Sequence, residues 1–190
     1  MINQDEILKI FKDAGALLTG HFKLTSGLHS GTYLEKFKVL QYPKYTEILC
    51  KEIAERFKDD NIEVVIGPVT GGVILAYEVA KQLNVRGIFT EREEGKMTLK
   101  RDFEIKHNER VLIVEDIITT GGSVMEIVNL VKELNGDIVG VGLLIDRSGD
   151  KVDFGVRKEA LATLNVENFR SEKCPLCKKG IPLTKRGSRK

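Results

Sequence analysis

The sequence lacks the features of a membrane or secreted protein. Its longest apolar stretches, such as "VLIV" and "IVGVGLLI", fall well short of the roughly 20 residues that a membrane-spanning helix needs. The amino terminus, "MINQDEILKIFKD", carries acidic residues too early for a signal peptide. The three cysteines are an odd number, which fits reduced thiols better than a disulfide framework. We therefore expect a cytoplasmic protein with no membrane partner.

Acidic residues are missing from the carboxyl-terminal end. Residues 173–190 contain seven Lys or Arg and no Asp or Glu, which leaves 23 basic (30 minus 7) and 28 acidic residues in the rest of the chain. A short basic tail is more often a solvated end than a polyanion-binding site, and no stretch resembles a helix-turn-helix. We expect no nucleic-acid partner.

Internal repeats and low-complexity segments are also absent, and the hydrophobic pattern is that of an α/β protein. Apolar spacing predicts helices over 4–14 and from Pro43 to about Lys58. Short β-branched runs then alternate with the helical stretches "GGVILAYEVAKQL" and "SVMEIVNLVKELNG"; the runs are "IEVVIG", "RGIFT", "VLIVED" and "IVGVGLLID". This order predicts a doubly wound, mostly parallel sheet, which binds ligands beyond the carboxyl ends of its strands. We expect a single domain over 1–190 with its core sheet in 60–150.

The stretch "VLIVEDIITTGGS", residues 111–123, combines two kinds of chemistry. Glu115 and Asp116 follow a buried strand, and carboxylates there suit sugar hydroxyls or a divalent cation. The loop 119–123 turns into a helix near Ser123, and its glycines, hydroxyls and backbone N–H groups suit a phosphate. A ligand that carries a phosphate group beside a pair of sugar hydroxyls is a ribose 5-phosphate. The plainer interpretation is an acidic strand end, a glycine turn and an N-capping serine.

Two other phosphate motifs are missing. No GxxxxGK[ST] occurs, and no GxGxxG opens a helix after a strand. Their absence weakens nucleoside-triphosphate and dinucleotide interpretations.

The stretch resembles the motif of the type I phosphoribosyltransferases, which bind 5-phosphoribosyl 1-diphosphate (PRPP): four apolar residues, two acids, two apolar residues and a Thr/Gly/Ser loop. All thirteen positions fit. The resemblance implies that the two acids hold the ribose 2′ and 3′ hydroxyls and that the loop holds the 5′-phosphate. The PRPP-binding residues it implies are Glu115, Asp116, Ile117, Ile118, Thr119, Thr120, Gly121, Gly122 and Ser123, with Thr70, Gly71 and Gly72 from a pyrophosphate loop.

Three further stretches resemble the orotate-specific branch of that family: "HFKLTSGLHSGTYLEK" (21–36), "IGPVTGGVILA" (66–76) and "LLIDRSGD" (143–150). The resemblance implies a small cap from 1–40 and about 165–190 over a base pocket. It also implies orotate contacts from Thr119, Arg147, Tyr33 and Leu34. An arginine suits the orotate carboxylate, although Arg147 could instead pair with Asp146 or Asp150.

The polar stretch 90–109 predicts a long loop or a mobile hairpin. Expulsion of pyrophosphate needs charge neutralisation, so Arg92 and Lys96 are the expected catalytic cations beside Asp116. The resemblance implies a homodimer in which this loop reaches the neighbouring site. Lys100 and Arg101 are possible auxiliaries. The alternative for all four cations is a solvated charged hairpin.

The chain departs from the enterobacterial pattern of that branch. Thr25 and Gly71 stand where two substrate-binding lysines are expected, and the loop histidine is absent. Lys23, Lys36 or the loop cations are candidate substitutes. Alternatively, the site relies more on metal and on backbone N–H groups at residues 70–72.

The tail sequence "CPLCKKG" is half of a zinc ribbon. The remaining ligands of a metal site would have to come from a second chain or from distant residues, because His21, His29 and His107 show no ligand spacing. The plainer expectation is a packed turn with reduced thiols, closed by Pro175 and Gly180. For the protein as a whole, no side chain is predicted with certainty to bind a metal ion. Cys50, on a predicted helix, is expected only to pack.

The resemblance implies transfer of the phosphoribosyl group from PRPP to N1 of orotate in pyrimidine (UMP) biosynthesis, with Mg²⁺ as cofactor. Two alternatives stay open. One is a phosphoribosyltransferase for another base, such as adenine or xanthine; the other is a PRPP-sensing regulator without turnover, whose effector would be a nucleic acid.

Overall fold

The computed structural model describes residues 2–24, 26–149 and 151–186, so Thr25 and Asp150 lie outside the described residues. The helices are α1 (Gln4–Asp13), α2 (Phe37–Leu40), α3 (Pro43–Phe57), α4 (Gly71–Leu83), α5 (Gly122–Glu133), the 3-10 turn η1 (Ser171–Lys173) and α6 (Pro175–Lys178). The strands are β1 (Leu17–Lys23), β2 (His29–Leu34), β3 (Val64–Pro68), β4 (Arg86–Glu93), β5 (Lys96–Leu99), β6 (Arg110–Ile118), β7 (Asp137–Asp146), β8 (Lys158–Thr163), β9 (Asn168–Phe169) and β10 (Thr184–Lys185).

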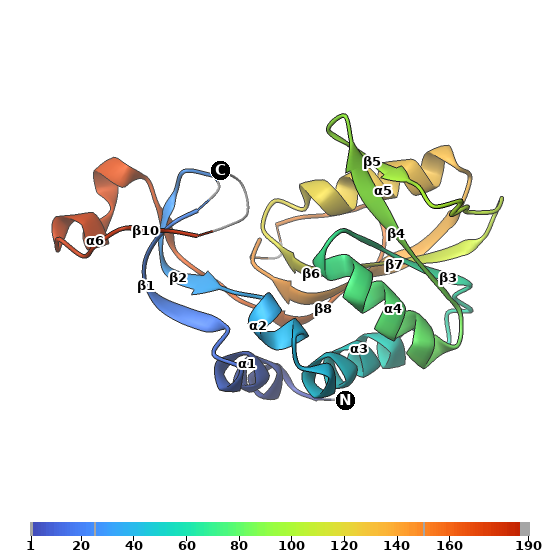
Figure 1. Ribbon diagram of the computed structural model, residues 1–190, viewed down its shortest axis with the longest axis horizontal. Helices are drawn as coiled ribbons and strands as arrows, with labels where there is room; N and C mark the ends of the chain where they lie inside the picture. Colours follow the sequence, from blue (N-terminus) through green and yellow to red (C-terminus); the bar gives the residue numbers. More distant parts are fainter. Residues whose placement is uncertain (1, 25, 150, 187–190) are drawn as a thin grey trace.

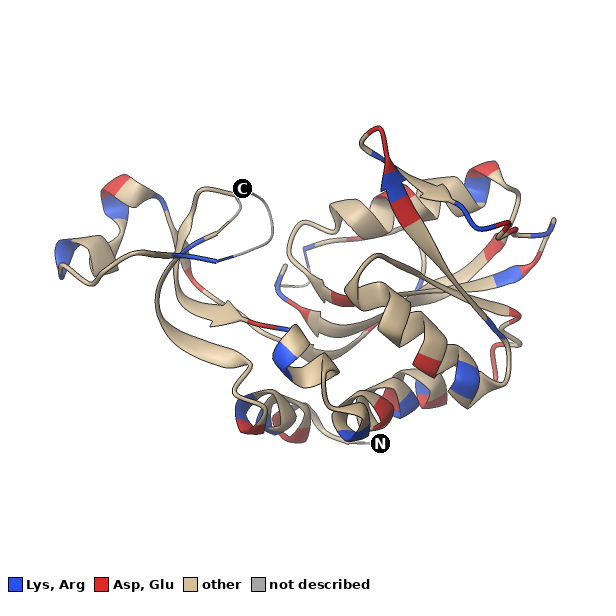
Figure 2. Cartoon of the chain, in the orientation of Figure 1, with Lys and Arg blue, Asp and Glu red and all other residues tan. Residues whose placement is uncertain are grey.

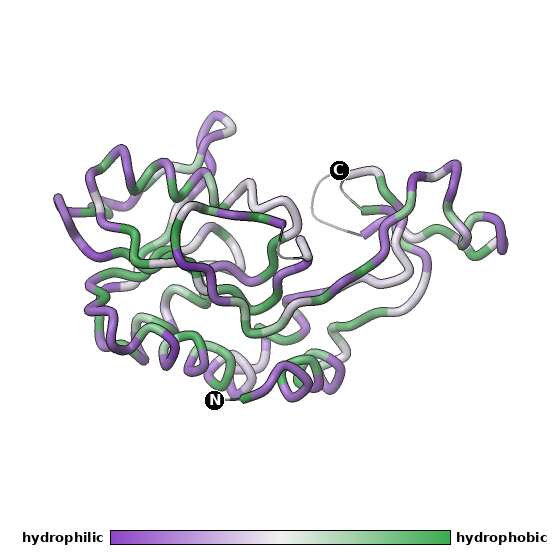
Figure 3. The backbone as a smooth tube through the Cα atoms, turned by 180° about the vertical axis from the view of Figure 1, so that it is seen from behind, coloured by the Kyte–Doolittle hydropathy of each residue, from purple (hydrophilic) through white to green (hydrophobic). Residues whose placement is uncertain are grey.

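The main sheet has six strands in the order β5-β4-β3-β6-β7-β8. Strands β4, β3, β6, β7 and β8 run parallel to one another. The edge strand β5 is antiparallel to β4. Helices α1, α3 and α4 pack on one face, and α5 packs on the other (Figure 1). The predicted mostly parallel α/β sheet is confirmed. Figure 3 shows hydrophobic residues recurring along its strands, as expected for strands covered on both faces.

Local sequence explains where the main elements begin and end. Asn3 caps α1, since its side chain accepts a hydrogen bond from the Glu6 backbone and the Glu6 carboxylate accepts one from Asn3. Pro43 opens α3, and Asn84 ends α4 in a left-handed conformation. These helices lie within a residue of the predicted bounds. Cys50 is fully buried on α3, and burial raises the pKa of its thiol to about 12, as expected of a packing residue.

A second, smaller sheet has the order β10-β1-β2-β9. The amino-terminal hairpin β1–β2 forms its centre, and two strands of the tail flank it. Figure 1 shows this sheet and α6 to one side of the main body. The sequence did not predict β8 or these strands. The described part of the tail, to residue 186, is therefore integrated into a sheet rather than being a free basic end.

The first half of the polar segment 90–109 forms a hairpin, and residues 100–109 are turns and irregular backbone. Strand β4 continues to Glu93, and β5 returns antiparallel to it from Lys96. Figure 2 shows basic and acidic residues close together on this hairpin. Its cations Lys100 and Arg101 pair with Glu93 and Glu91 at 2.8 Å, which fits a solvated charged hairpin. Among the described residues, no helix is long and apolar enough to span a membrane.

Candidate active site

Strands β3 and β6 are neighbours at the centre of the sheet, and their connecting helices leave to opposite faces. Helix α4 follows β3, and α5 follows β6. The sheet order reverses between these strands, which makes their carboxyl ends the expected ligand crevice. Residues 69–72 and 115–123 both lie there, so the fold brings together two segments that sequence reasoning assigned to one substrate.

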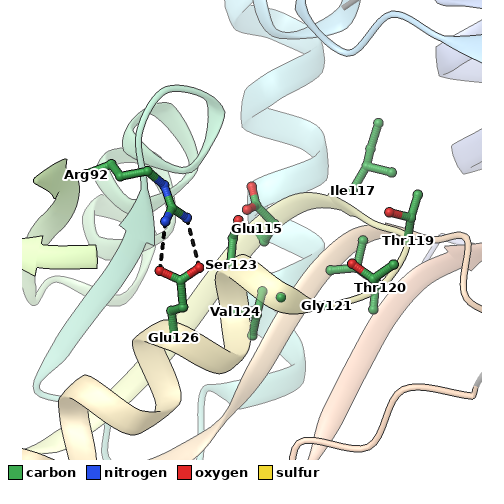
Figure 4. A pocket seen from close by; sticks show the side chains of 11 residues that line it. Arg92, Glu115, Ile117, Thr119, Thr120, Gly121, Ser123, Val124 and Glu126 are labelled. Atoms are coloured by element: carbon green, nitrogen blue, oxygen red, sulfur yellow. Dashed lines mark hydrogen bonds and ion pairs between the residues drawn. The ribbon is translucent and has the colours of Figure 1, made fainter. Parts of the chain in front are cut away.

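The loop after β6 lines a pocket of about 340 Å³ (Figure 4). Gly121 has a φ of 72°, in the left-handed region, and a Cβ there would lie 2.6 Å from Val152. Only glycine fits this turn without strain. The pocket is lined by Arg92, Glu115, Ile117, Ile118, Thr119, Thr120, Gly121, Gly122, Ser123, Val124 and Glu126. Hydroxyl groups, glycine backbone and the amino end of α5 thus face one space, which suits an anion.

Arg92 reaches the pocket from the hairpin and is held by Glu126 of α5. Two of its nitrogens donate to the two Glu126 carboxylate oxygens at 3.0 and 2.9 Å (Figure 4). Arg92 also donates to the Gly95 carbonyl. The bidentate pair fixes the guanidinium at the pocket wall. Sequence reasoning did not identify Glu126 as its partner.

The adjacent acids Glu115 and Asp116 are almost fully buried at the end of β6. Burial, followed by the neighbouring Asp116 carboxylate, raises the pKa of Glu115 to about 8. Burial also raises the pKa of Asp116, although Lys36 opposes this effect. The pair therefore holds a proton more tightly than isolated carboxyls, and hydrogen-bond donors such as sugar hydroxyls would favour its ionised form.

Lys36 lies against Asp116, with Nζ 2.9 Å from Oδ1 and 2.8 Å from Oδ2. Only the Oδ1 contact has hydrogen-bond geometry, so the Oδ2 contact is electrostatic. Gly71 completes the cluster, because a Cβ there would collide with the Asp116 carboxylate and lie 3.5 Å from Lys36 Nζ. The first turn of α4 can approach the acids this closely only with glycine at position 71.

A second pocket, of about 480 Å³, adjoins the first. Its lining residues are Leu24, Ser26, Leu28, Tyr33, Leu34, Lys36, Asp116, Ile117, Thr119, Thr120, Arg147, Ser148 and Asn168. Ile117, Thr119 and Thr120 line both pockets. The four residues assigned to orotate are all present, and the small sheet supplies much of the remaining wall.

The second pocket is lined by two cations, Lys36 and Arg147. Lys36 pairs with Asp116, whereas Arg147 has no counter-ion among the described residues. Within the described residues it forms no ion pair, and its buried Nε has no hydrogen-bond partner. Burial lowers the pKa of Arg147. Asp146 does not pair with it, since Lys158 Nζ lies 2.7 Å from Asp146 and Ser148 also donates to that carboxylate. A half-buried guanidinium that pairs with none of the described residues suits an anionic ligand.

Comparison with known proteins matches residues 40–158 to the phosphoribosyl transferase domain family. The chain is 56% identical to the orotate phosphoribosyltransferase of Thermoanaerobacter sp. (strain X514) and 55% identical to that of Caldicellulosiruptor bescii, covering all of both chains in each case. The chain belongs to the orotate phosphoribosyltransferases. The crystal structure of the Aeropyrum pernix orotate phosphoribosyltransferase matches with a TM-score of 0.72 at 27% identity, over 83% of this chain and 93% of that one.

Within this orotate phosphoribosyltransferase fold, the candidate substitutes for the missing lysines differ in position. Lys36 reaches the space beside Gly71, whereas Lys23 is exposed. Lys96 lies on the exposed edge strand β5 and does not line either pocket described above. The position of Thr25 is outside the described residues. Lys36 is thus the cation that the fold, rather than any local motif, brings to the acids.

Proposed function

We propose that the protein transfers the 5-phosphoribosyl group from PRPP to N1 of orotate, giving orotidine 5′-phosphate and pyrophosphate in UMP biosynthesis. One observation carries this proposal: a hydroxyl-rich pocket shares the wall of Ile117, Thr119 and Thr120 with a pocket whose Arg147 forms no ion pair with any described residue. A phosphorylated sugar in the first would present its C1 to an anionic base in the second.

The side chains act mainly by positioning and neutralising charge. Thr119, Thr120 and Ser123 hold the 5′-phosphate, together with the backbone N–H groups of residues 121 and 122. Glu115 and Asp116 accept hydrogen bonds from the ribose hydroxyls. The bond from C1 to the diphosphate oxygen breaks with its electron pair on the diphosphate, while N1 of orotate bonds to C1. No covalent protein nucleophile is needed.

The leaving pyrophosphate is bound by residues 70–72, with Arg92 and Lys96 as the cations that neutralise its charge. Mg²⁺ fits the same region, because the oxygens of PRPP form the hard-oxygen donor set that this ion prefers and lie beside two buried carboxylates that attract a cation. Bound there, Mg²⁺ would supply charge neutralisation for the leaving group. Glu115 and Asp116 would support it through the ribose hydroxyls.

Arg147 also favours orotate over a neutral base as the acceptor. A neutral purine would leave the half-buried guanidinium, and its buried Nε, without a partner among the described residues, which costs free energy, whereas the orotate carboxylate pairs with it. A regulator without turnover would keep the PRPP motif but would not need Arg92 and Lys96 as catalytic cations.

We propose one domain, with the small sheet and tail as a cap, assembled as a cytoplasmic homodimer. The three free cysteines favour a reducing compartment. Hairpin 86–99 presents Lys96 on an exposed edge, where it could reach a second subunit. No nucleic-acid or membrane partner is proposed.

An assay of base consumption tests the proposal. Purified protein is incubated with PRPP, Mg²⁺ and one of orotate, adenine, xanthine or uracil, and pyrophosphate release is followed. Of the four bases, we expect only orotate to give rapid pyrophosphate release. Chelation of Mg²⁺ should abolish that release. Rapid release with a purine would move the assignment to another base. No release with any base, together with tight RNA or DNA binding, would favour the regulator.

A further inference from the structure

Four side chains outside the active site converge on one point at the far end of the small sheet. They are His21, His29, Cys174 and Cys177, and one ligand atom from each lies within 4.8 Å of all the others. His21, His29 and Cys174 are buried, and Cys177 is partly open to solvent. Two histidines and two cysteines in one cluster form a donor set typical of structural zinc sites.

Secondary structure explains why distant residues meet here. Strand β1 contains an extra residue between Thr19 and Phe22, so Lys23 rather than Phe22 pairs with His29. A shift of one residue exchanges the two faces of a strand, and this bulge therefore puts His21 on the face of His29. The tail supplies the cysteines around the start of α6, where a three-residue spacing places both on one side of the turn. His21 and His29 are thus distant residues of the kind that the half-ribbon would need, and they reach the cysteines in space although they show no ligand spacing in the sequence.

Four of the six distances between ligand atoms are close to the edges of a tetrahedron, and the other two are within 4.8 Å. A zinc ion with bonds of roughly 2.0 Å to nitrogen and 2.3 Å to sulfur has N···N edges of about 3.3 Å and N···S edges of about 3.5 Å. Here His21 Nε2 lies 3.0 Å from His29 Nδ1 and 3.5 Å from Cys174 Sγ. Cys177 Sγ lies 3.7 Å from His21 Nε2 and 3.3 Å from His29 Nδ1.

The ring of His21 is also oriented as a metal ligand requires. Its Nδ1 lies 2.8 Å from the Ile181 carbonyl oxygen, to which it can only donate. A neutral ring protonated at Nδ1 presents the lone pair of Nε2 toward the other three groups. Metal-bound histidines almost always use their second nitrogen in this way. The carbonyl belongs to the same tail as both cysteines, so the tail supplies ligands and also orients one.

We propose that His21 Nε2, His29 Nδ1, Cys174 Sγ and Cys177 Sγ bind one structural Zn²⁺ per chain, which fastens the tail to the amino-terminal hairpin. Thiolate and imidazole donors select zinc over Mg²⁺, which prefers oxygen. The site is separate from the catalytic pockets but acts on one of them indirectly. Hairpin residues Leu24 and Leu28 and tail residue Asn168 line the second pocket, and β9 pairs with β2 beside His29.

Metal analysis of the untagged full-length protein tests the site directly. After gel filtration in metal-free buffer, elemental analysis should give one zinc per chain. Cys174→Ser and Cys177→Ser should each lower the zinc content to below about a tenth. Cys50→Ala and His107→Gln are the matched controls, since Cys50 is buried on α3 and His107 is exposed elsewhere, and both should keep one equivalent. Cobalt substitution should give the visible bands of a tetrahedral ion with thiolate ligands.

Limited proteolysis tests the fastening role. Trypsin should cut near Lys178, Lys179 and Lys185 much faster after zinc is removed by a chelator, and re-addition of zinc should restore protection. The site is refuted if the wild-type protein carries no zinc and takes up none, or carries iron instead. This test uses the wild-type protein, so it does not depend on whether a variant folds. Equal cutting rates with and without zinc would overturn the fastening role.

Discussion

Lys36 and Asp116, 80 residues apart, form an ion pair in the wall of the second pocket, with Nζ 2.9 Å from Oδ1. Asp116 is 1% exposed, and the Lys36 side chain is 34% exposed. Burial lowers the pKa of Lys36, but the Asp116 carboxylate more than offsets it, so the net shift is upward. The lysine thus keeps its charge where ribose hydroxyls and pyrophosphate are proposed to bind.

Lys36→Met should destabilise the protein by about 2 kcal/mol at pH 8, because it leaves a buried carboxylate without its counter-ion. The loss should shrink at lower pH, where Asp116 can take up a proton. Urea unfolding at pH 6 and pH 8 measures this difference. Lys9→Met is the control, since Lys9 pairs with Asp13 on the surface. A loss as large for Lys9→Met would mean that the buried pair contributes nothing specific.

Asp116→Asn should lower kcat/KM for PRPP by at least about 100-fold, because an amide cannot replace both acceptor oxygens toward the ribose hydroxyls. Steady-state kinetics with saturating orotate provide the measurement. Asp137→Asn, at the other end of the sheet, should change little. Nearly intact turnover in Asp116→Asn would show that the acid pair has been wrongly assigned.

Glu115→Gln should flatten the pH dependence of stability. The pKa of Glu115 is raised to about 8 in the folded protein, from an ordinary value of 4.5, so the folded state binds more protons in this window. Stability should therefore fall as pH rises from about 5 to 8, by a few kcal/mol. Thermal unfolding of wild type and Glu115→Gln across this range should show the two curves diverging. Glu133→Gln, at an exposed carboxyl, should follow wild type.

Arg147→Met should raise KM for orotate by about 100-fold, since removing one partner of a buried charge pair costs roughly 2–5 kcal/mol. KM for PRPP should change by less than about threefold, because the phosphate pocket does not include Arg147. Arg170→Met is the control on the exposed tail. Equal changes in both KM values would argue for a general structural defect rather than recognition of the base.

Lys96→Ala and Asp116→Asn should complement each other if active sites are shared between subunits. Each variant alone should be nearly inactive. After joint unfolding and refolding, half of the dimers are mixed and each has one intact site, so the mixture should recover about a quarter of wild-type activity. Activity equal to the average of the two parents would place Lys96 in the site of its own chain or outside the mechanism.

Sequence reasoning predicted the elements whose signals are local. The helices 43–57 and 71–83 and the strand run 111–116 carry their own periodicity, caps and breakers, and they lie close to the expected bounds. Strands β1, β2, β9 and β10 were not predicted because their sequences alternate weakly. The pairing of β1 with β10 joins residues 162 positions apart (184 minus 22), for which no local pattern exists.

The candidate site shows the same division. The thirteen-residue motif contained both the acids and the phosphate loop, so the donor pocket could be predicted from one segment. Arg147 was identified by resemblance, but its lack of a counter-ion could not be, because Lys158 and Ser148 satisfy Asp146 only in the folded chain. Lys36 was only one of several candidate cations until the fold placed it beside Gly71.

By itself, the sequence determined an α/β sheet and a ribose-phosphate motif at the end of one strand, because periodicity and short-range turn chemistry are properties of contiguous residues. Only the tertiary structure decided which cation neutralises Asp116, that Lys158 rather than Arg147 pairs with Asp146, and which histidines meet Cys174 and Cys177. These are contacts between segments far apart in the chain. They depend on strand register, including the single extra residue in β1, and no local pattern encodes them.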